Sequence, residues 1–206
     1  MLPMKTLLQL NSSLFSANGQ STRLAEDFTA AQKALDPNLQ VIVRDLAKDP
    51  VPHLTAERFA AFLAKPAERT PAQAEAVAYS DALIDELRRA DTIVIGLPMY
   101  NFGLPSPLKA YFDHIARAGV TFKYTDKGPV GLLGGKKVFV FAARGGVYAG
   151  TPADTQTAYV REFLAFLGMT EVEFVYAEGL ALGDESRSAS LASAQAAIRR
   201  AVEAYA

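Results

Sequence analysis

One short segment in the middle of the chain limits the fold more than any other. The residues from Ile93 to Leu97 carry no polar side chain, and the run ends abruptly at Pro98. An apolar run of this length, closed by a breaker, is typical of a parallel strand covered on both faces. Such a strand predicts an α/β protein. In open sheets of this class, ligands bind beyond the carboxyl ends of the strands, so the residues after 97 become the candidate site.

Strand and helix patterns alternate along the rest of the chain. We expect five strands, at residues 6–10, 41–44, 92–97, 137–142 and 173–176. Amphipathic or Ala-rich stretches predict helices at residues 21–35, 56–64, 71–89, 106–116, 155–166 and 185–205. Ser21 is the expected N-cap of the first helix. Residues 119–135, rich in Gly and aromatic side chains, are expected to form a long functional loop.

This alternation predicts a flavodoxin-like, doubly wound α/β fold. We expect a five-stranded parallel sheet in the order 2-1-3-4-5, with helices on both faces. That order places the loops after the first and third strands at one crevice, and the loop after the fourth strand borders it. No linker or internal repeat interrupts the chain, so residues 1–206 are expected to form a single domain.

Composition excludes several classes of function. The formal net charge of -1 indicates neither a nucleic-acid nor a membrane partner. Without cysteine the chain has no disulfide and no thiolate nucleophile, which suits a reducing cytoplasm. The first residues do not resemble a signal peptide, and no apolar run approaches the ~18 residues of a membrane span. Two histidines without cysteine predict no metal site. We therefore expect a cytoplasmic protein.

The loop after the first expected strand, residues 12–22, is rich in hydroxyls and opens a helix. Helix N-termini offer free N–H groups and partial positive charge, which suit a phosphate. Neither GxGxxG nor GxxxxGK[ST] is present, so a phosphate loop of the flavodoxin kind remains. Taken alone, a Ser-rich loop is equally typical of simple helix capping.

Two further loops suit a flat, polar-edged ring such as a flavin. Tyr100, Asn101 and Phe102 follow the third strand and combine aromatic faces with an amide. Gly145 and Gly146 follow the fourth strand and permit close backbone approach to a ring. Packing of Tyr100 in the core and solvation of Arg144 are the structural alternatives.

Together these loops resemble those of the bacterial FMN-dependent NADH-azoreductases, which belong to the flavodoxin-like quinone reductases. The resemblance rests on Pro98-Met99-Tyr100-Asn101-Phe102, on Arg144-Gly145-Gly146, and on the Ser12-Ser13…Gln20-Ser21 loop. It extends to residues 116–124, 134–137, 163–168 and 177–179 and so covers nearly the whole chain.

The resemblance implies bound FMN, NADH or NADPH as co-substrate, and residues 1–206 as one FMN-binding domain. The following residues match the family's FMN-binding motifs and are therefore expected to bind FMN: Ser13, Gly19, Gln20, Ser21, Pro98, Met99, Tyr100, Asn101, Phe102, Ala143, Arg144, Gly145 and Gly146. Family members often have Ser at the positions of Gly19 and Ala143. Each lost hydroxyl removes a hydrogen bond worth about 0.5–1.5 kcal/mol.

The family is homodimeric, with the active site at the subunit interface. The resemblance therefore implies that Phe102, Phe122, Tyr124 and Phe166 line the substrate cavity, some from the partner chain. We expect an FMN-dependent NAD(P)H oxidoreductase that reduces quinones and azo compounds by a ping-pong, two-electron mechanism. FMN carries the chemistry, so no side chain is assigned a catalytic role. The alternatives are a flavodoxin-type electron carrier, an FMN-free interaction module, and a nitro- or FMN-reductase on the same scaffold.

Overall fold

Five parallel strands form the central sheet of the computed structural model, which describes residues 4–205. They are β1 (Thr6–Asn11), β2 (Gln40–Asp45), β3 (Thr92–Pro98), β6 (Lys137–Ala143) and β7 (Glu171–Ala177). Their order is β2-β1-β3-β6-β7, which becomes 2-1-3-4-5 when only this sheet is numbered. The predicted five-stranded parallel sheet is confirmed. Residues 1–3, part of the segment judged not to be a signal peptide, and residue 206 lie outside the described range.

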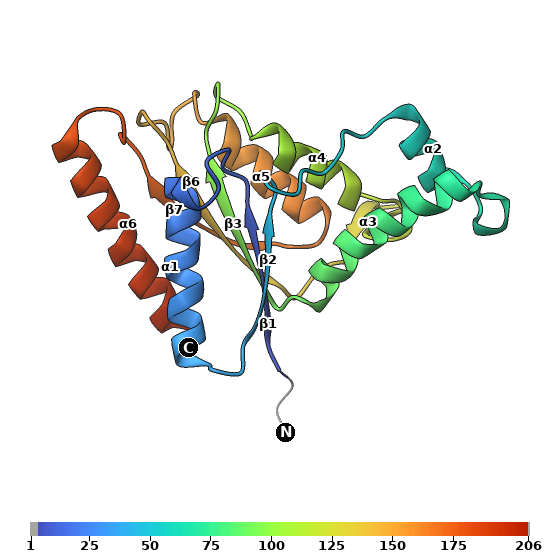
Figure 1. Cartoon of the computed structure of the whole chain (residues 1–206), viewed down its shortest axis with the longest axis horizontal. Helices are drawn as coiled ribbons and strands as arrows, with labels where there is room; N and C mark the ends of the chain where they lie inside the picture. The colour runs from blue at the N-terminus through green and yellow to red at the C-terminus, as the bar shows by residue number, and fades with distance from the viewer. Residues whose placement is uncertain (1–3, 206) are drawn as a thin grey trace.

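Helices lie against both faces of this sheet, as Figure 1 shows. One face carries α1 (Gln20–Leu35) and α6 (Asp184–Tyr205). The other carries α3 (Pro71–Arg89), α4 (Ser106–Ile115) and α5 (Thr155–Phe166), while α2 (Ala56–Leu63) packs on α3. No helix within the described range is long and apolar enough to cross a membrane.

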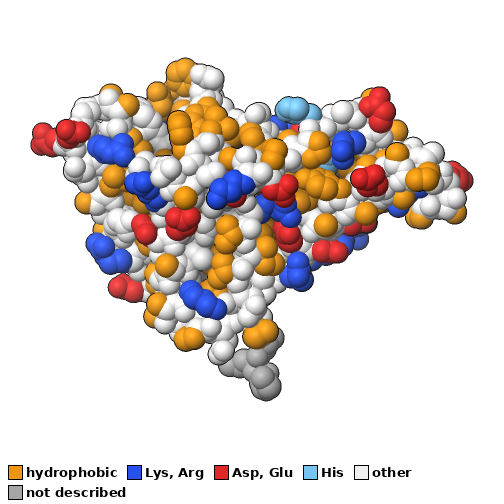
Figure 2. Space-filling view, viewed as in Figure 1, with side chains coloured by type: hydrophobic (Ala, Val, Ile, Leu, Met, Phe, Trp, Pro, Cys, Tyr) orange, Lys and Arg blue, Asp and Glu red, His pale blue; other side chains and the backbone are white. Residues whose placement is uncertain are grey.

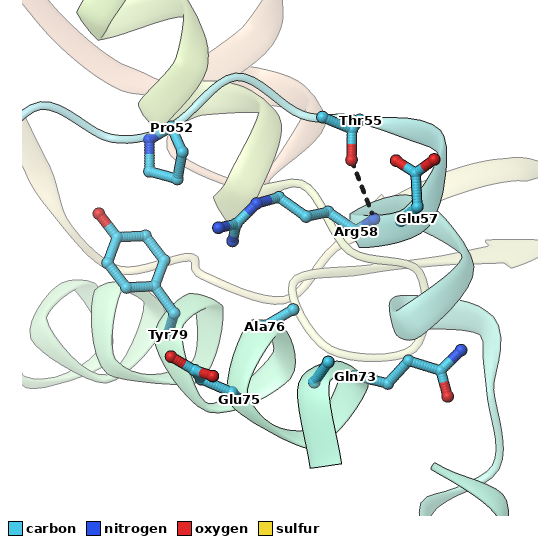
Figure 3. A pocket seen from close by; sticks show the side chains of 9 residues that line it. Pro52, Thr55, Glu57, Arg58, Gln73, Glu75, Ala76 and Tyr79 are labelled. Atoms are coloured by element: carbon cyan, nitrogen blue, oxygen red, sulfur yellow. Dashed lines mark hydrogen bonds between the residues drawn. The ribbon is translucent and has the colours of Figure 1, made fainter. Parts of the chain in front are cut away.

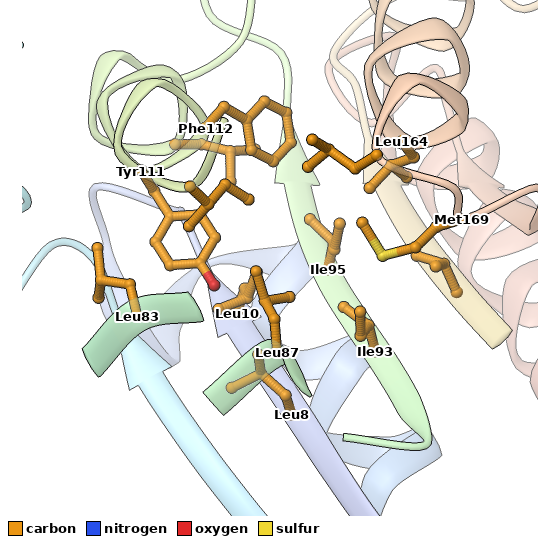
Figure 4. Packing of buried hydrophobic residues seen from close by; sticks show 14 of the residues in the cluster. Leu8, Leu10, Leu83, Leu87, Ile93, Ile95, Tyr111, Phe112, Leu164 and Met169 are labelled. Atoms are coloured by element: carbon orange, nitrogen blue, oxygen red, sulfur yellow. The ribbon is translucent and has the colours of Figure 1, made fainter. Parts of the chain in front are cut away.

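The core lies on both sides of β3, which is buried along its whole length. Ile93 and Ile95 join the cluster under α3, α4 and α5, part of which is drawn in Figure 4. Val94, between them in sequence, joins the opposite cluster under α1 and α6. Successive strand residues point to opposite faces, so an apolar run is what a strand between two helical layers requires. Full burial of one such side chain contributes about 1.5–3 kcal/mol.

The prediction of a long loop at residues 119–135 is wrong, because this segment contains an antiparallel hairpin. Strands β4 (Phe122–Thr125) and β5 (Gly128–Gly131) pair there, and Gly128, at φ 109°, supports the turn between them. Strand β4 (Phe-Lys-Tyr-Thr) has only the minimum length at which alternation can be read, and β5 (Gly-Pro-Val-Gly) has the composition of a turn. The hairpin packs against the end of α5, where a Cβ on Gly131 would lie 2.0 Å from the Gly168 nitrogen.

His114 is fully buried in α4. Its Nδ1 lies 2.9 Å from the Ala110 carbonyl oxygen, and Phe62 and Tyr79 approach its ring edge-on. Nε2 has no hydrogen-bond partner among the described residues. Burial lowers the pKa of His114 below its ordinary value, outweighing the hydrogen bond to Ala110.

Because the pKa of His114 is lowered in the folded state, we expect the free energy of unfolding to fall in mild acid. Below about pH 6.5 the unfolded chain takes up a proton at this position before the folded chain does, at a cost of up to ~1.4 kcal/mol per pH unit. We expect His114→Phe to flatten the free energy of unfolding between pH 7 and pH 5, measured by urea denaturation. His53→Phe, at an exposed site, is the control. Equal slopes for His114→Phe and wild type would contradict the prediction.

Candidate functional site

A hollow of about 280 Å³ lies beyond the carboxyl ends of β3 and β6. Hydrophobic side chains gather on this rim of the molecule, at the top of Figure 2. The hollow is lined by Met99, Asn101, Phe102, Gly145, Gly146 and Tyr148. The structure thus brings the loops after the third and fourth sheet strands together. Tyr148, which no motif indicated, completes the wall, with its ring 5.7 Å from that of Phe102.

Free backbone N–H groups distinguish this hollow. Within residues 4–205, no acceptor meets the N–H of Asn101, Phe102, Gly145 or Gly146. Asn101 and Phe102 also adopt positive φ angles of 50° and 62°, which is uncommon outside glycine. Strain of this kind persists only where the surroundings hold the loop in place, and it clusters at ligand sites. The arrangement suits a ligand whose edge carries hydrogen-bond acceptors.

Gln156 in the first turn of α5 holds the loop of residues 98–103. Its side chain is fully buried, and Nε2 donates to the carbonyl oxygens of Pro98 and Gly103, each at 2.9 Å. The hydroxyl of Thr155 donates to the Phe102 carbonyl. The sequence interpretation missed Gln156. The available signal was a polar residue at helical spacing from the buried Val160 and Leu164.

The side chain of Arg144 lies away from the hollow and is completely buried, which excludes a solvated arginine. Its Nη2 donates to Asp154 at 2.8 Å and its Nη1 to Glu178 at 3.0 Å, while the guanidinium stacks over Tyr176. Burial alone would raise the pKa of Asp154, but hydrogen bonds from Arg144 and Thr157 outweigh it and hold that pKa below its usual value.

Helix α1 begins one residue earlier than predicted, and its N-cap is Gly19, so the assignment of Ser21 as N-cap is wrong. Ser21 lies inside the first turn and is fully buried. A Cβ on Gly19 would lie 2.1 Å from the hydroxyl oxygen of Ser13, which leaves no room for a capping side chain. The first turn of α1 therefore has neither a side-chain cap nor an acidic residue. The N–H groups of Gln20, Ser21 and Thr22 have no acceptor among the described residues, and an uncapped helix start of this kind suits an anion.

Tyr100 joins this uncapped helix start to the hollow. Its hydroxyl lies 3.3 Å from that of Ser13 and accepts a hydrogen bond from the Leu14 N–H at 3.2 Å. The predicted residues of the first and third loops therefore meet at one edge of the sheet. Ala143, at the end of β6, accepts a hydrogen bond from the Met99 N–H at 3.1 Å and joins the third and fourth loops.

The aromatic residues predicted for the substrate cavity form two separate groups. Phe122 lies 4.3 Å from Phe166 and 5.5 Å from Tyr124, ring to ring. Phe166 ends α5, about 16 Å along the helix from Thr155, whose hydroxyl donates to the carbonyl oxygen of Phe102. Among the described residues, no ring contact joins this group to Phe102.

A larger hollow of about 420 Å³ lies between α2 and α3 and contains none of the predicted site residues. Figure 3 shows Arg58, Glu57 and Glu75 around it. The two helices that border it are capped by their own residues, Thr55 and Thr70, so their N-termini are not free to bind an anion. Within residues 4–205, no group of three or more acidic or histidine side chains is placed to hold a metal.

The comparison with known sequences agrees with this geometry. A family profile described as a flavodoxin-like fold, Flavodoxin_2, matches residues 4–202. A Cellvibrio japonicus protein named FMN-dependent NADH:quinone oxidoreductase is 52% identical over 201 residues, spanning 98% of this chain and all of that protein. FMN-dependent NADH:quinone oxidoreductase 6 of Burkholderia lata is 56% identical over 198 residues, spanning 96% of this chain and all of that protein.

Solved structures give the same result. An azoreductase from Bacillus anthracis superposes with a TM-score of 0.88 at 33% identity, covering 97% of this chain and all of that one. An FMN-dependent NADH-azoreductase from the same species, solved in complex with FMN, superposes with a TM-score of 0.89 at 28% identity, covering 98% of this chain and all of that one.

Gln156 provides a test of how the loop is held. We expect Gln156→Met to lower the free energy of unfolding by about 1–3 kcal/mol, because the buried Pro98 carbonyl loses this donor and the Gly103 carbonyl keeps only the Tyr100 N–H. Gln32→Met, at a buried glutamine whose Nε2 has no partner among the described residues, is the matched control and should cost less. Chemical denaturation of both variants measures the difference. Equal losses would show that the two hydrogen bonds do not hold the loop.

Proposed function

The chain belongs to the Flavodoxin_2 family of the flavodoxin-like fold, and we propose that it is an FMN-dependent NADH:quinone oxidoreductase that also reduces azo compounds. The family resemblance predicted from the sequence is confirmed. The proposal includes residues 1–206 as one doubly wound FMN-binding domain. One observation carries it. An uncapped helix start and two loops with free N–H groups meet at the same edge of the sheet.

The phosphate end of FMN fits the start of α1. An anion there would receive the N–H groups of Gln20, Ser21 and Thr22, which have no acceptor among residues 4–205. The partial positive charge of a helix of this length favours the same anion. Ser13, whose hydroxyl fills the space beside Gly19, borders the anion position.

The ring end of FMN fits the hollow beyond β3 and β6. The free N–H groups of Asn101, Phe102, Gly145 and Gly146 would donate to the oxygen and nitrogen acceptors of the pyrimidine edge. The missing Cβ atoms of Gly145 and Gly146 let the backbone approach the ring. Phe102 and Tyr148 supply aromatic walls. The residues present therefore fit the cofactor at both ends.

FMN, when bound, would supply two-electron chemistry between NADH and a quinone or azo acceptor. The chain holds the ring, donates hydrogen bonds to its edge and shields one side of it. No side chain at the hollow is assigned proton transfer. NADH and the acceptor bind at the same place, one after the other. The proposal therefore includes ping-pong kinetics.

We further propose a homodimer whose active site includes residues of both subunits. Support comes from the separation of the predicted aromatics, because Tyr124, 74% exposed, and Phe102, 57% exposed, lie in different groups. Figure 1 draws the β4–β5 hairpin beside α3, away from the loops at the top of the sheet. A second copy would bring such a hairpin to the hollow. A cytoplasmic location is also proposed, and the absence of cysteine suits it.

Anaerobic stopped-flow spectroscopy of the FMN-loaded protein tests the function. We expect NADH to bleach the flavin absorbance near 450 nm, and a benzoquinone or an azo dye to restore it. Parallel lines in double-reciprocal plots would support the ping-pong order. If FMN binds but NADH does not bleach it, a carrier reduced by another protein replaces the enzyme as the leading hypothesis.

If the phosphate binds at the start of α1, a negative charge introduced there should weaken the binding of FMN but not that of riboflavin. Gln20→Glu places an anion at the start of α1, which we expect to stabilise the apoprotein by about 0.3–1 kcal/mol. The same charge repels phosphate, so the Kd of FMN should rise about fivefold or more while that of riboflavin, which lacks phosphate, stays the same. Flavin fluorescence titration measures both. Gln40→Glu, exposed at the start of β2, is the control. An equal change for FMN and riboflavin would contradict the assignment.

A further inference from the structure

Glu178 directly follows β7 and holds the loop of residues 145–149 with one carboxylate oxygen. That oxygen accepts hydrogen bonds from the N–H groups of Tyr148 and Ala149, each at 2.9 Å. It also accepts from Nη1 of Arg144 at 3.0 Å. The side chain of Glu178 is only 13% exposed. One largely buried carboxylate oxygen therefore meets three donors from a single short segment.

These bonds decide which backbone groups of the loop remain available. The N–H groups of Tyr148 and Ala149 donate to Glu178. The carbonyl oxygen of Gly145 accepts from the Ala181 N–H at 3.0 Å, and that of Gly146 accepts from the Gly179 N–H at 2.8 Å. The N–H groups of Gly145 and Gly146 are left without an acceptor among the described residues. The segment of residues 178–181 thus holds the loop by hydrogen bonds, and the two N–H groups without an acceptor belong to Gly145 and Gly146, which line the hollow.

Charge accompanies this arrangement. Arg144 is the buried cation, and it pairs with both Glu178 and Asp154, so the three side chains together carry a formal charge of -1. Loss of one carboxylate would bring that sum to zero. A buried charge acts over a longer distance than an exposed one, because water screens it less. Arg144 directly precedes Gly145, which lines the hollow, so the charge of this cluster adjoins the place where a ring would take up electrons.

We propose that Glu178 is a positioning residue of the flavin site, which holds residues 145–149 in their binding conformation and makes the local charge more negative. This inference rests on the proposed function. It concerns a residue that is not among the predicted FMN contacts, and it assigns Glu178 a role through Tyr148, Ala149 and Arg144 rather than through contact with the ring.

The test compares three variants of the full chain. Glu178→Ala removes the acceptor, whereas Glu178→Gln keeps one oxygen for the three donors, removes the charge and replaces the other oxygen with an NH2 group. Glu173→Gln, exposed on the same strand, is the matched control. We expect the Kd of FMN to rise at least about tenfold in Glu178→Ala, because the loop loses charge-assisted hydrogen bonds. It should stay within about threefold in Glu178→Gln and be unchanged in the control.

Two further readouts separate positioning from general damage. Amide hydrogen exchange of the apoprotein should quicken at Tyr148 and Ala149 in Glu178→Ala and remain slow in Glu178→Gln. The reduction potential of bound FMN should become more positive in Glu178→Gln, since a less negative surrounding favours the reduced, electron-rich ring. A purely structural role would leave that potential unchanged.

Either of two results would overturn the proposal: wild-type FMN affinity and wild-type amide protection in Glu178→Ala, or an unchanged potential in Glu178→Gln. If Glu178→Ala does not fold, Glu178→Gln still decides through the potential. Failure of the proposed function itself is recognised separately, because the wild-type protein would then bind no FMN, or would bind FMN that NADH does not bleach. The exchange measurement needs no flavin, so slow exchange in Glu178→Ala would still refute the positioning role.

Discussion

The buried guanidinium of Arg144 connects the loops around the hollow to one another. A charge removed from water must be paired, and here Glu178 and Asp154 pair it. Glu178 in turn accepts hydrogen bonds from two backbone N–H groups of the loop of residues 145–149. Asp154 caps α5, whose next two residues hold the loop of residues 98–103. Removal of either carboxylate would leave the guanidinium paired with the other, but the loop or the start of α5 would lose its hydrogen-bond acceptor.

Helix capping shows a second division of roles. Side chains close the N-termini of α2, α3 and α5, through Thr55, Thr70 and Asp154. The N-cap of α1 is instead Gly19, beside a serine that leaves no space for a capping side chain. Its N–H groups are therefore available at the edge of the sheet where the other two loops meet. An anion bound there satisfies donors that the protein itself leaves open.

Prediction succeeded where the signal was local and failed where it was not. The strand at Ile93–Leu97 was recognisable because burial on both faces demands an unbroken apolar run. The β4–β5 hairpin was not, since β4 has only four residues and β5 contains two glycines and a proline, which are typical of turns. Gln156 and Glu178 were missed for a different reason. Apart from the Arg144 side chain, their partners are backbone atoms between 29 and 58 positions away, and backbone atoms leave no trace in a sequence.

The sequence by itself determined the succession of strands and helices, the parallel sheet and the three loops that meet at its carboxyl edge, because hydrophobic periodicity and breaker residues are local properties. Only the tertiary structure decided which backbone N–H groups stay free, that Arg144 turns away from the hollow, and that Phe122 and Tyr124 lie apart from Phe102. These depend on distances between segments far apart in the chain, and packing, not composition, sets those distances.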